Sequence, residues 1–294
     1  MSPTESRIST GIPTLDEHLG GGLLPGTLSV ILGATGIGKT QLGTHFTQND
    51  PTNPGITFDM SARGDGQNHL GYAQRMYQAR LQPVANNRRF NVSEVVNIEE
   101  AIGDYLHVFE MAGQRVTKRD LEMEQWRDWQ AELNRKLHTS IGFIYSNLIR
   151  GRNKIVVDGI EPVDVSAESI QLNLFEYIYH QIIRKEAEWV ARDLFRQDFR
   201  TVANRVSELA YDPETISCMA LWTSKEMMLD DLIKRQIEEG DVISNANTLI
   251  LMGKTQLKNK IGRALFIAKH RGSYCSETIL PYEIKEDGIH FLQT

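Results

Sequence analysis

The residues best suited to chemistry in this chain lie in one glycine-rich segment. The pattern G-x-x-x-x-G-K-[ST] is met by Gly33, Gly38, Lys39 and Thr40, and this spacing is typical of loops that hold polyphosphate. Glycines let such a loop turn its backbone N–H groups inward, and a helix that begins there adds partial positive charge. Lys39 is predicted to reach the β- and γ-phosphates of ATP, and the Thr40 hydroxyl to bind Mg²⁺. The predicted nucleotide-binding residues are Gly33, Ala34, Thr35, Gly36, Ile37, Gly38, Lys39, Thr40 and Gln41.

A bound Mg²⁺ also needs a carboxylate at the end of a neighbouring buried strand. The apolar run at residues 155–157 is followed by Asp158, which is the best candidate for this metal-binding role. The competing interpretation is an aspartate that only begins a turn before Gly159. Because the same chain carries a glycine-rich loop, the metal-binding interpretation is favoured.

Regular elements must bring the loop and this carboxylate together. The residues before the loop, 28–32, form an apolar run suited to a buried strand, and residues 40–46 can begin a helix. Helical patterns separate this run from similar ones at 55–59, 155–158, 216–223 and 248–252. This alternation predicts an α/β fold with a mainly parallel sheet flanked by helices. Closing strands that add an antiparallel edge are predicted at 264–268, 279–284 and 289–292.

The lead-in to the glycine loop carries a family resemblance. The stretch 9-STGIPTLDEHLGGGLLPGTLSVILGATGIGKT-40 resembles the start of the nucleotide domain of RecA-superfamily P-loop ATPases, and it is most similar to the KaiC-like branch. Downstream, the closing strands of that family are resembled by 243-ISNANTLILM-252, 269-KHRG-272 and 287-DGIHF-291. The resemblance implies a RecA-like core with an antiparallel C-terminal edge. It covers both ends and the central strands and fades in the middle of the chain.

The resemblance implies further site residues. In that family a second strand ends in two acidic residues that position the attacking water, and the matching pair here is Asp59 and Met60. A lysine and an arginine of the closing strands reach a neighbouring subunit's nucleotide, and the matching residues are Lys269 and Arg271. The predicted catalytic residues are therefore Lys39, Asp59, Lys269 and Arg271. Without the resemblance, Lys269 and Arg271 would be interpreted as part of a solvated basic hairpin.

The departure at Met60 predicts slow hydrolysis. Asp59 has the chemistry of a base but is one methylene shorter than glutamate, and a displacement of about 1 Å can cost on the order of a hundredfold in rate. Met60 has no group that could act as a base. Glu161, just beyond Asp158, is a weaker substitute for Asp59.

The predicted function is a KaiC-like, slowly hydrolysing ATPase that acts as a regulatory or signalling switch. If Lys269 and Arg271 act on a neighbour, the nucleotide lies between subunits of a hexameric ring or another homo-oligomer that ATP helps to assemble. Two alternatives stay open. One is a nucleotide-gated scaffold with negligible hydrolysis, and the other is a recombinase-like ATPase that binds DNA through the basic stretch at 254–271.

Two helical insertions are predicted within a single domain that spans residues 1–294. Helices are expected at 68–82, 98–112 and 119–149, and the first insertion covers about 98–149. Within it, one helix face carries an apolar stripe typical of core packing, formed by Trp126, Trp129, Leu133 and Leu137. The second insertion, at 163–212, contains neither glycine nor proline and predicts a long helix or helix pair. It either protrudes as a partner-docking arm or folds back on its own domain.

Composition sets the outer limits of the function. The 294 residues are 40% hydrophobic and 24% charged, as in ordinary globular proteins. No run approaches the roughly 18 apolar residues of a membrane span, and the first residues lack a signal-peptide core, so a cytoplasmic location is expected. Cys218 and Cys275 lack metal-ligand spacing, and no chemistry is predicted for them. The net charge of −6 argues against a nucleic-acid coat protein.

Overall fold

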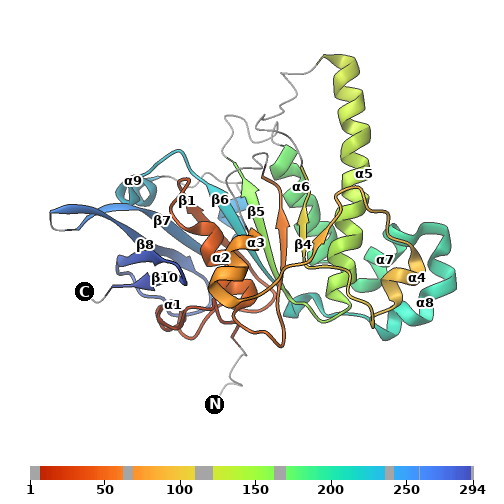
Figure 1. Ribbon diagram of the computed structural model, residues 1–294, viewed down its shortest axis with the longest axis horizontal. Helices are drawn as coiled ribbons and strands as arrows, with labels where there is room; N and C mark the ends of the chain where they lie inside the picture. The colour runs from red at the N-terminus through yellow and green to blue at the C-terminus, as the bar shows by residue number, and fades with distance from the viewer. Residues whose placement is uncertain are drawn as a thin grey trace.

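A ten-stranded sheet runs through the described part of the molecule (Figure 1). The computed structural model describes residues 7–61, 69–109, 122–161, 170–235, 242–257 and 259–292. The strand order across the sheet is β10-β9-β8-β7-β1-β6-β5-β2-β4-β3. Strands from β7 to β3 in this order pair in parallel, whereas β8, β9 and β10 add an antiparallel edge.

Most strands coincide with the apolar runs of the sequence, whereas β3 and β4 lie outside the predicted runs. In chain order they are β1 (Leu28–Gly33), β2 (Ile56–Asp59), β3 (Pro83–Val84), β4 (Tyr105–His107), β5 (Lys154–Ile160), β6 (Ser217–Thr223), β7 (Thr248–Leu257), β8 (Lys260–His270), β9 (Leu280–Lys285) and β10 (Gly288–Phe291). Every residue of β1 and of β5 is buried. Such uninterrupted burial is expected where helices cover both faces of a parallel sheet.

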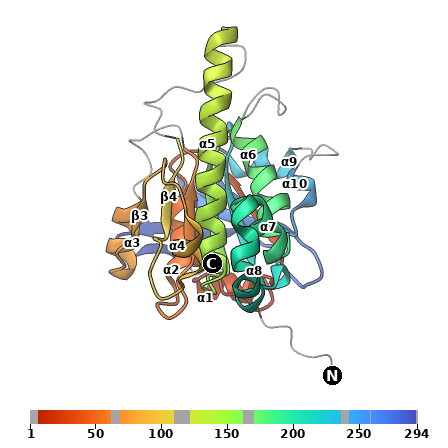
Figure 2. The ribbon, with the colours of Figure 1, turned by 90° about the vertical axis from the view of Figure 1, so that its right-hand side faces the viewer.

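The helices fill the connections between these strands. In chain order they are α1 (Pro13–His18), α2 (Lys39–Gln48), α3 (His69–Tyr77), α4 (Val92–Val96), α5 (Met123–Leu148), α6 (Ile170–Ile178), α7 (Ala187–Phe195), α8 (Phe199–Glu208), α9 (Leu229–Lys234) and α10 (Val242–Asn245). A short π-helix, η3 (Tyr179–Ile183), continues α6, and two 3₁₀ turns are η4 (Arg196–Asp198) and η5 (Pro213–Thr215). The first turns of α5 extend beyond the other described elements (Figures 1 and 2).

Two hydrophobic cores lie on the two faces of the sheet. Successive strand residues alternate between them, so Val30 belongs to one core and Ile31 to the other. On the face of Ile31, α1 and α2 pack together with side chains of β9 and β10. On the face of Val30, α5, α6, α7 and α8 cover the sheet. The sheet is thus a middle layer whose carboxyl strand ends remain available for a site.

The predicted α/β class, mainly parallel with an antiparallel C-terminal edge, is confirmed. The helices expected at 68–82 and 119–149 correspond to α3 and, in its described part, to α5. The helix expected at 98–112 is wrong in its described part, because residues 105–107 form β4 between β2 and β3. A strand here satisfies backbone groups that β2 would otherwise leave unpaired at a sheet edge. Residues 110–112 lie outside the described residues.

The described part of the second insertion folds back on its own domain. The predicted long helix is broken into α6, α7 and α8, and Arg196, with φ 49°, marks the bend between α7 and α8. Phe175, Val190 and Val206 of these helices are buried in the same core as β1 and β5. In the first insertion Leu137 packs against that core. The other side chains of the predicted stripe, Trp126, Trp129 and Leu133, lie outside the described part.

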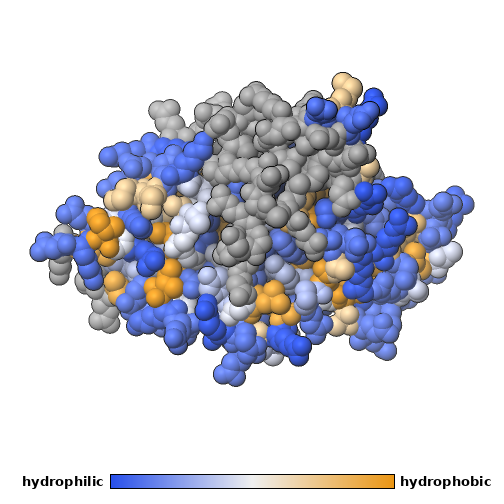
Figure 3. Space-filling view, turned by 45° about the horizontal axis from the view of Figure 1, so that its top comes forward, coloured by the Kyte–Doolittle hydropathy of each residue, from blue (hydrophilic) through white to orange (hydrophobic). Residues whose placement is uncertain are grey.

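The described surface is largely polar on the face that Figure 3 shows, where hydrophobic areas are small and separate. In the part of the chain that the structure describes, no helix combines the length and the apolar character needed to cross a membrane.

Candidate functional site

The glycine-rich segment joins β1 to α2 at the carboxyl end of the parallel strands. β1 ends at Gly33, residues 34–38 form the turn, and α2 begins with Lys39, Thr40 and Gln41. Gly36 and Gly38 have φ angles of 76° and 112°, a left-handed conformation that favours glycine. A Cβ placed on Gly36 would meet no atom within 4 Å, so the space beside this exposed glycine is open. An open turn at a helix N-terminus fits a polyphosphate group.

Lys39 reaches back across this loop. Its Nζ donates to the carbonyl oxygens of Gly33 at 2.9 Å and Ala34 at 3.0 Å. Burial lowers the pKa of Lys39 to about 8, and the charges of Asp158 and Glu161 oppose that shift. A phosphate in the loop would add negative charge beside the ammonium and favour its protonated form. The Lys39 ammonium group therefore lies against the first residues of the loop.

Thr40 and Asp158 meet although 118 residues separate them in the chain. Thr40 Oγ1 donates to Asp158 Oδ2 at 2.8 Å, across the end of β6, which lies between β1 and β5. Burial works to raise the pKa of Asp158, but contacts with His69 and Thr40 outweigh it and hold the pKa below its usual value. A hydroxyl beside an ionised carboxylate fits Mg²⁺, which takes one or two side-chain oxygens together with phosphate oxygens and waters.

Asp59 ends β2 directly beside Asp158, its partner in the sheet register. Its Oδ1 accepts from the N–H of Ser61 at 2.8 Å, and its Oδ2 accepts from the Tyr105 hydroxyl at 2.9 Å. Asp59 is only 1% exposed, and the neighbouring Met60 is fully buried in the hydrophobic core. The structure thus brings Asp59 to the expected place, but it does so with both oxygens engaged and away from solvent.

His69 joins this pair of carboxylates, and sequence reasoning missed it. Its Nε2 lies 3.3 Å from Asp158 Oδ2 and 3.8 Å from Asp59 Oδ2, and no described group is aligned to accept a hydrogen bond from it. Burial opposes a charge on the imidazole, but the contact with Asp158 and the charge of Asp59 outweigh it and raise the pKa of His69. No sequence motif marks His69 or Tyr105, because only the placement of α3 and β4 beside β2 brings them here.

Gly159 holds the ends of β2 and β5 against each other. It has a φ of 91°, and a Cβ at this position would lie 2.2 Å from the backbone nitrogen of Ser61, a distance that real atoms do not adopt. The N–H of Met60 donates to the backbone oxygen of Asp158 at 2.8 Å. The two strand ends are therefore as close as backbones can come, which fixes the separation of the two carboxylates. Glycine is needed here for this approach, while the side chain of Asp158 contacts Thr40.

Lys269 and Arg271 lie at the opposite end of the sheet from the glycine loop. β8 runs antiparallel to β7, which is parallel to β1, so the end of β8 lies at the amino end of the parallel strands. The N–H of Arg271 donates to the backbone oxygen of Asn247, just before β7 begins. The side chains of Lys269 and Arg271 both donate to the carbonyl oxygen of Ser244, at 2.7 Å and 3.1 Å. One subunit therefore does not bring these cations to its own loop.

The C-terminal hairpin of β9 and β10 braces the glycine loop and α2. The Tyr282 hydroxyl donates to the carbonyl oxygen of Ile37 at 2.7 Å. The N–H of Ile289 donates to His45 Nε2 at 3.0 Å, and His45 Nδ1 lies 2.6 Å from the Tyr77 hydroxyl. Because Nε2 accepts, the His45 ring is neutral, and burial lowers its pKa to about 4. These contacts join the loop, α2, α3 and the antiparallel edge.

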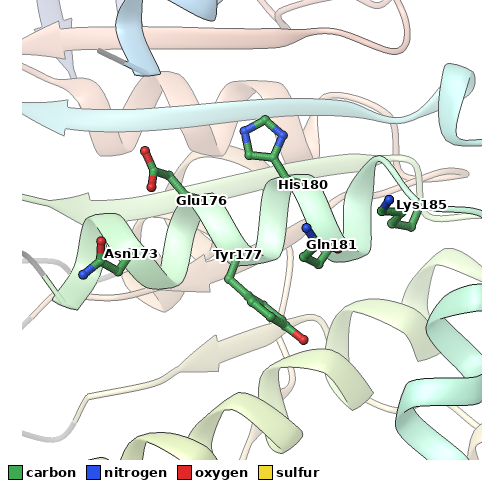
Figure 4. Close-up of a pocket in the computed structure, with 6 residues that line it drawn as sticks. All are labelled: Asn173, Glu176, Tyr177, His180, Gln181 and Lys185. Carbon is green, nitrogen blue, oxygen red and sulfur yellow. The ribbon is translucent and has the colours of Figure 1, made fainter. Parts of the chain in front are cut away.

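A separate surface hollow of about 640 Å³ lies along α6 and η3 (Figure 4). Its described lining residues are Asn173, Glu176, Tyr177, His180, Gln181 and Lys185. Five of them come from α6 and η3, Lys185 follows η3, and none is a predicted site residue. The hollow therefore brings no group to the site at the carboxyl ends of the strands.

Comparison with known proteins points to the same part of the chain. A family model described as "ATPase: KaiC" matches residues 8–164. The matched region contains the lead-in, the glycine loop, Asp59, His69 and Asp158, whereas Lys269 and Arg271 lie beyond it. No curated protein matches the chain.

Proposed function

The chain belongs to the KaiC family of ATPases, whose model matches more than half of its 294 residues, and we propose that it binds ATP with Mg²⁺, hydrolyses the ATP slowly and acts as a regulatory switch in an oligomeric ring. The observation that carries this proposal is the hydrogen bond from Thr40 to Asp158, next to Lys39, whose ammonium group donates to the loop carbonyl of Gly33. Two distant parts of the chain thereby supply a phosphate-binding group and a metal-binding group to one point.

Nucleotide binding is assigned to the loop and the first turn of α2. The backbone N–H groups of residues 33–38 and the N-terminus of α2 face the phosphates, and Lys39 contacts the β- and γ-phosphates. Thr40 would hold Mg²⁺, with Asp158 hydrogen-bonded to Thr40 and to the metal's waters. The bound metal would neutralise charge on the phosphate oxygens during transfer.

Hydrolysis is assigned to Asp59 as the group that accepts a proton from the attacking water. Its chemistry and its place beside Asp158 support this role. Its near-complete burial and its two hydrogen bonds predict that turnover is slow. Glu161, whose charge acts on Lys39, is the alternative carboxylate.

The oligomeric ring is supported by the placement of Lys269 and Arg271. Because these cations lie at the end of the sheet opposite to their own glycine loop, they can stabilise a transition state only on the nucleotide of another copy. A contact that joins two different surfaces of identical subunits is head-to-tail and generates rings or filaments. Each nucleotide would then lie between two subunits, so that its state controls the assembly that partners recognise.

Nucleotide binding is tested by titrating the purified chain with a fluorescent, slowly hydrolysed ATP analogue in the presence of Mg²⁺. Lys39→Ala removes a charge-assisted contact and is expected to weaken binding roughly ten- to a hundredfold. Lys185→Ala, at a half-buried lysine just beyond η3 that lies over the Trp189 ring, is the matched control and should bind as the wild type does. Equal affinity in Lys39→Ala and the wild type would contradict the assignment.

Assembly is tested by measuring the mass of the protein in solution with and without ATP and Mg²⁺. The wild type is expected to form a larger species with ATP. Arg271→Ala should lose assembly or turnover, whereas Arg192→Ala, an arginine that pairs with Glu188 on the surface of α7, should not. A wild type that stays monomeric with saturating ATP would overturn the ring.

The burial of Asp59 also favours a second candidate, a scaffold that binds ATP with negligible hydrolysis. Phosphate release followed over hours separates the two, since the proposed ATPase accumulates phosphate and the scaffold does not. DNA binding has weaker support among the described residues, because the basic stretch is divided. Lys254 and Arg263 lie opposite each other on neighbouring strands near the tip of the β7–β8 hairpin. Lys269 and Arg271 lie at its other end.

A further inference from the structure

We propose that His69 occupies the position that the attacking water needs and thereby keeps Asp59 from acting as a base until the first turn of α3 moves. This inference rests on the proposed function and deepens it, because it names the residue that limits hydrolysis. His69 is in this sense a positioning residue, since it acts through Asp59 and the water.

The chemistry of phosphoryl transfer restricts where this water can lie. A general base must come within about 2.6–3.2 Å of the water that it deprotonates. The water must also attack the γ-phosphorus in line with the leaving oxygen, and the metal ions that bridge the phosphate oxygens fix the place of that phosphorus. In this chain the water therefore belongs on the side of Asp59 that faces Asp158 and Thr40.

The imidazole of His69 fills that side. Its Nε2 stands between the two carboxylates, 3.3 Å from Asp158 and 3.8 Å from Asp59. The side chain is only 3% exposed, so it is enclosed between α3 and the strand ends. A water that contacted both Asp59 and the γ-phosphate would have to take the place of this ring.

The remaining surroundings of Asp59 leave it no other approach among the described residues. One carboxylate oxygen is bound by the N–H of Ser61 and the other by the Tyr105 hydroxyl. Tyr105 comes from β4, and its ring lies beside that of His69, with centroids 5.6 Å apart. Two side chains from two different elements thus enclose the same carboxylate.

The attachment of α3 explains how the position could open. His69 is the first residue of the helix, whereas Tyr77, its last residue, is tied to His45 of α2. The two ends of α3 are therefore held by separate contacts. Displacing the first turn would withdraw the imidazole while the Tyr77 contact keeps the helix against α2.

The experiment measures ATP turnover and analogue binding separately in His69→Ala. With the ring removed, kcat is expected to rise about tenfold, which is less than the full rate gain that a general base can give. The Kd of the slowly hydrolysed analogue should stay within about twofold of the wild type. His107→Ala is the matched control, because that histidine lies at the same strand ends and contacts the backbone oxygen of Ser61 rather than a carboxylate. It should not accelerate turnover.

A second variant and a second readout guard against misfolding of His69→Ala. Tyr105→Phe releases one oxygen of Asp59 and should raise kcat several-fold with unchanged analogue affinity. In the wild type, hydrogen–deuterium exchange over residues 69–77 should increase when ATP and Mg²⁺ are added. Folded variants that bind the analogue normally and hydrolyse ATP no faster, or an α3 whose exchange is the same with and without ATP, would overturn the inference. A wild type that binds no ATP would instead overturn the proposed function, and this inference with it.

Discussion

The glycine loop and the carboxylate pair lie at the same edge of the sheet, but they are built in opposite ways. The loop is open, since a Cβ on Gly36 would meet nothing within 4 Å, and among the described residues its lysine donates hydrogen bonds to the loop's own carbonyl oxygens. The carboxylate pair is closed, because His69 stands between Asp59 and Asp158 and Tyr105 binds Asp59. The loop thus leaves open space beside Gly36, whereas side chains occupy the surroundings of the carboxylate pair.

Under the proposed function, this difference predicts that binding and cleavage depend on different elements. The loop depends on β1, α2 and the hairpin that braces it, while the carboxylate pair depends on β2, β5, α3 and β4. Changes in the first group should act mainly on affinity, and changes in the second mainly on turnover.

The largest expected effect is a loss of turnover on replacing Asp158, which contacts both α2 of the loop and α3 beside the carboxylate pair. Asp158→Asn keeps the shape of the side chain but removes the charge that contacts both Thr40 and His69. Loss of a carboxylate that orients a metal ligand typically costs ten- to a hundredfold in metal affinity or activity, so we expect about that loss of Mg²⁺-dependent turnover. Asp231→Asn, on the exposed face of α9, is the control. Unchanged dependence of turnover on Mg²⁺ concentration in Asp158→Asn would break the assignment.

A fall in pH should lower the free energy of unfolding, because His45, which joins α2 to β10 and α3, would take up a proton. Burial and the charge of His290 lower the pKa of His45 to about 4, with Asp287 opposing, whereas the unfolded chain protonates it near its usual value of 6.5. The unfolded state therefore binds more protons between these values, so stability is full above pH 6.5 and is lost as the pH falls toward 4. We expect a loss of roughly 3 kcal/mol from this group.

Urea unfolding at several pH values measures that loss. His45→Gln cannot take up the proton, so its stability should fall less steeply between pH 6.5 and 4. Equal slopes in the wild type and His45→Gln would show that other groups account for the acid sensitivity.

Alanine substitutions at two glycines separate an effect on nucleotide binding from the stability cost of backbone strain. Gly36 and Gly151 have φ angles of 76° and 79°, and a Cβ on either would meet no atom within 4 Å. Replacing either by alanine should therefore cost a similar roughly 1–2 kcal/mol of stability. Only Gly36 belongs to the glycine loop, so only Gly36→Ala should also weaken analogue binding. Equal binding by the two variants would place the phosphate elsewhere.

The smallest expected effect concerns the brace from β9. Tyr282→Phe removes the hydrogen bond to the carbonyl oxygen of Ile37 and leaves that buried acceptor without its partner. We expect a loss of about 1 kcal/mol in the free energy of unfolding and a few-fold weaker analogue binding, with kcat unchanged. Tyr274→Phe, on a side chain that is 73% exposed, should change neither quantity.

Local sequence patterns were sufficient to predict much of the fold. β1 and the loop follow from an apolar run and a glycine spacing that are contiguous in the chain, and Asp158 follows from its place at the end of a buried run. β4 was mistaken for a helix because the residues at 105–107 become a strand only by pairing with β2. The break of the second insertion near Arg196 likewise reflects packing on the sheet rather than a glycine or proline in the sequence.

The candidate site was predictable only where its residues are close in the chain or resemble a family pattern. His69 and Tyr105 lie in segments without a motif, and their importance arises from contacts with Asp59 and Asp158 in space. Lys269 and Arg271 are candidates because of the resemblance alone, and their position at the far end of the sheet depends on strand direction. That position determines which nucleotide they could serve, and no spacing in the sequence reveals it.

The close approach at Gly159 determines which side of the site can move. Because Gly159 has no Cβ, β5 can lie against the backbone of Ser61, and a shift between the two strand ends would break this contact and the hydrogen bond from Met60 to Asp158. Among the described elements beside the site, α3 is the one whose displacement we propose. Control of the reaction would then be a mechanical event in a single helix, measurable as a displacement of α3 against an unmoving sheet.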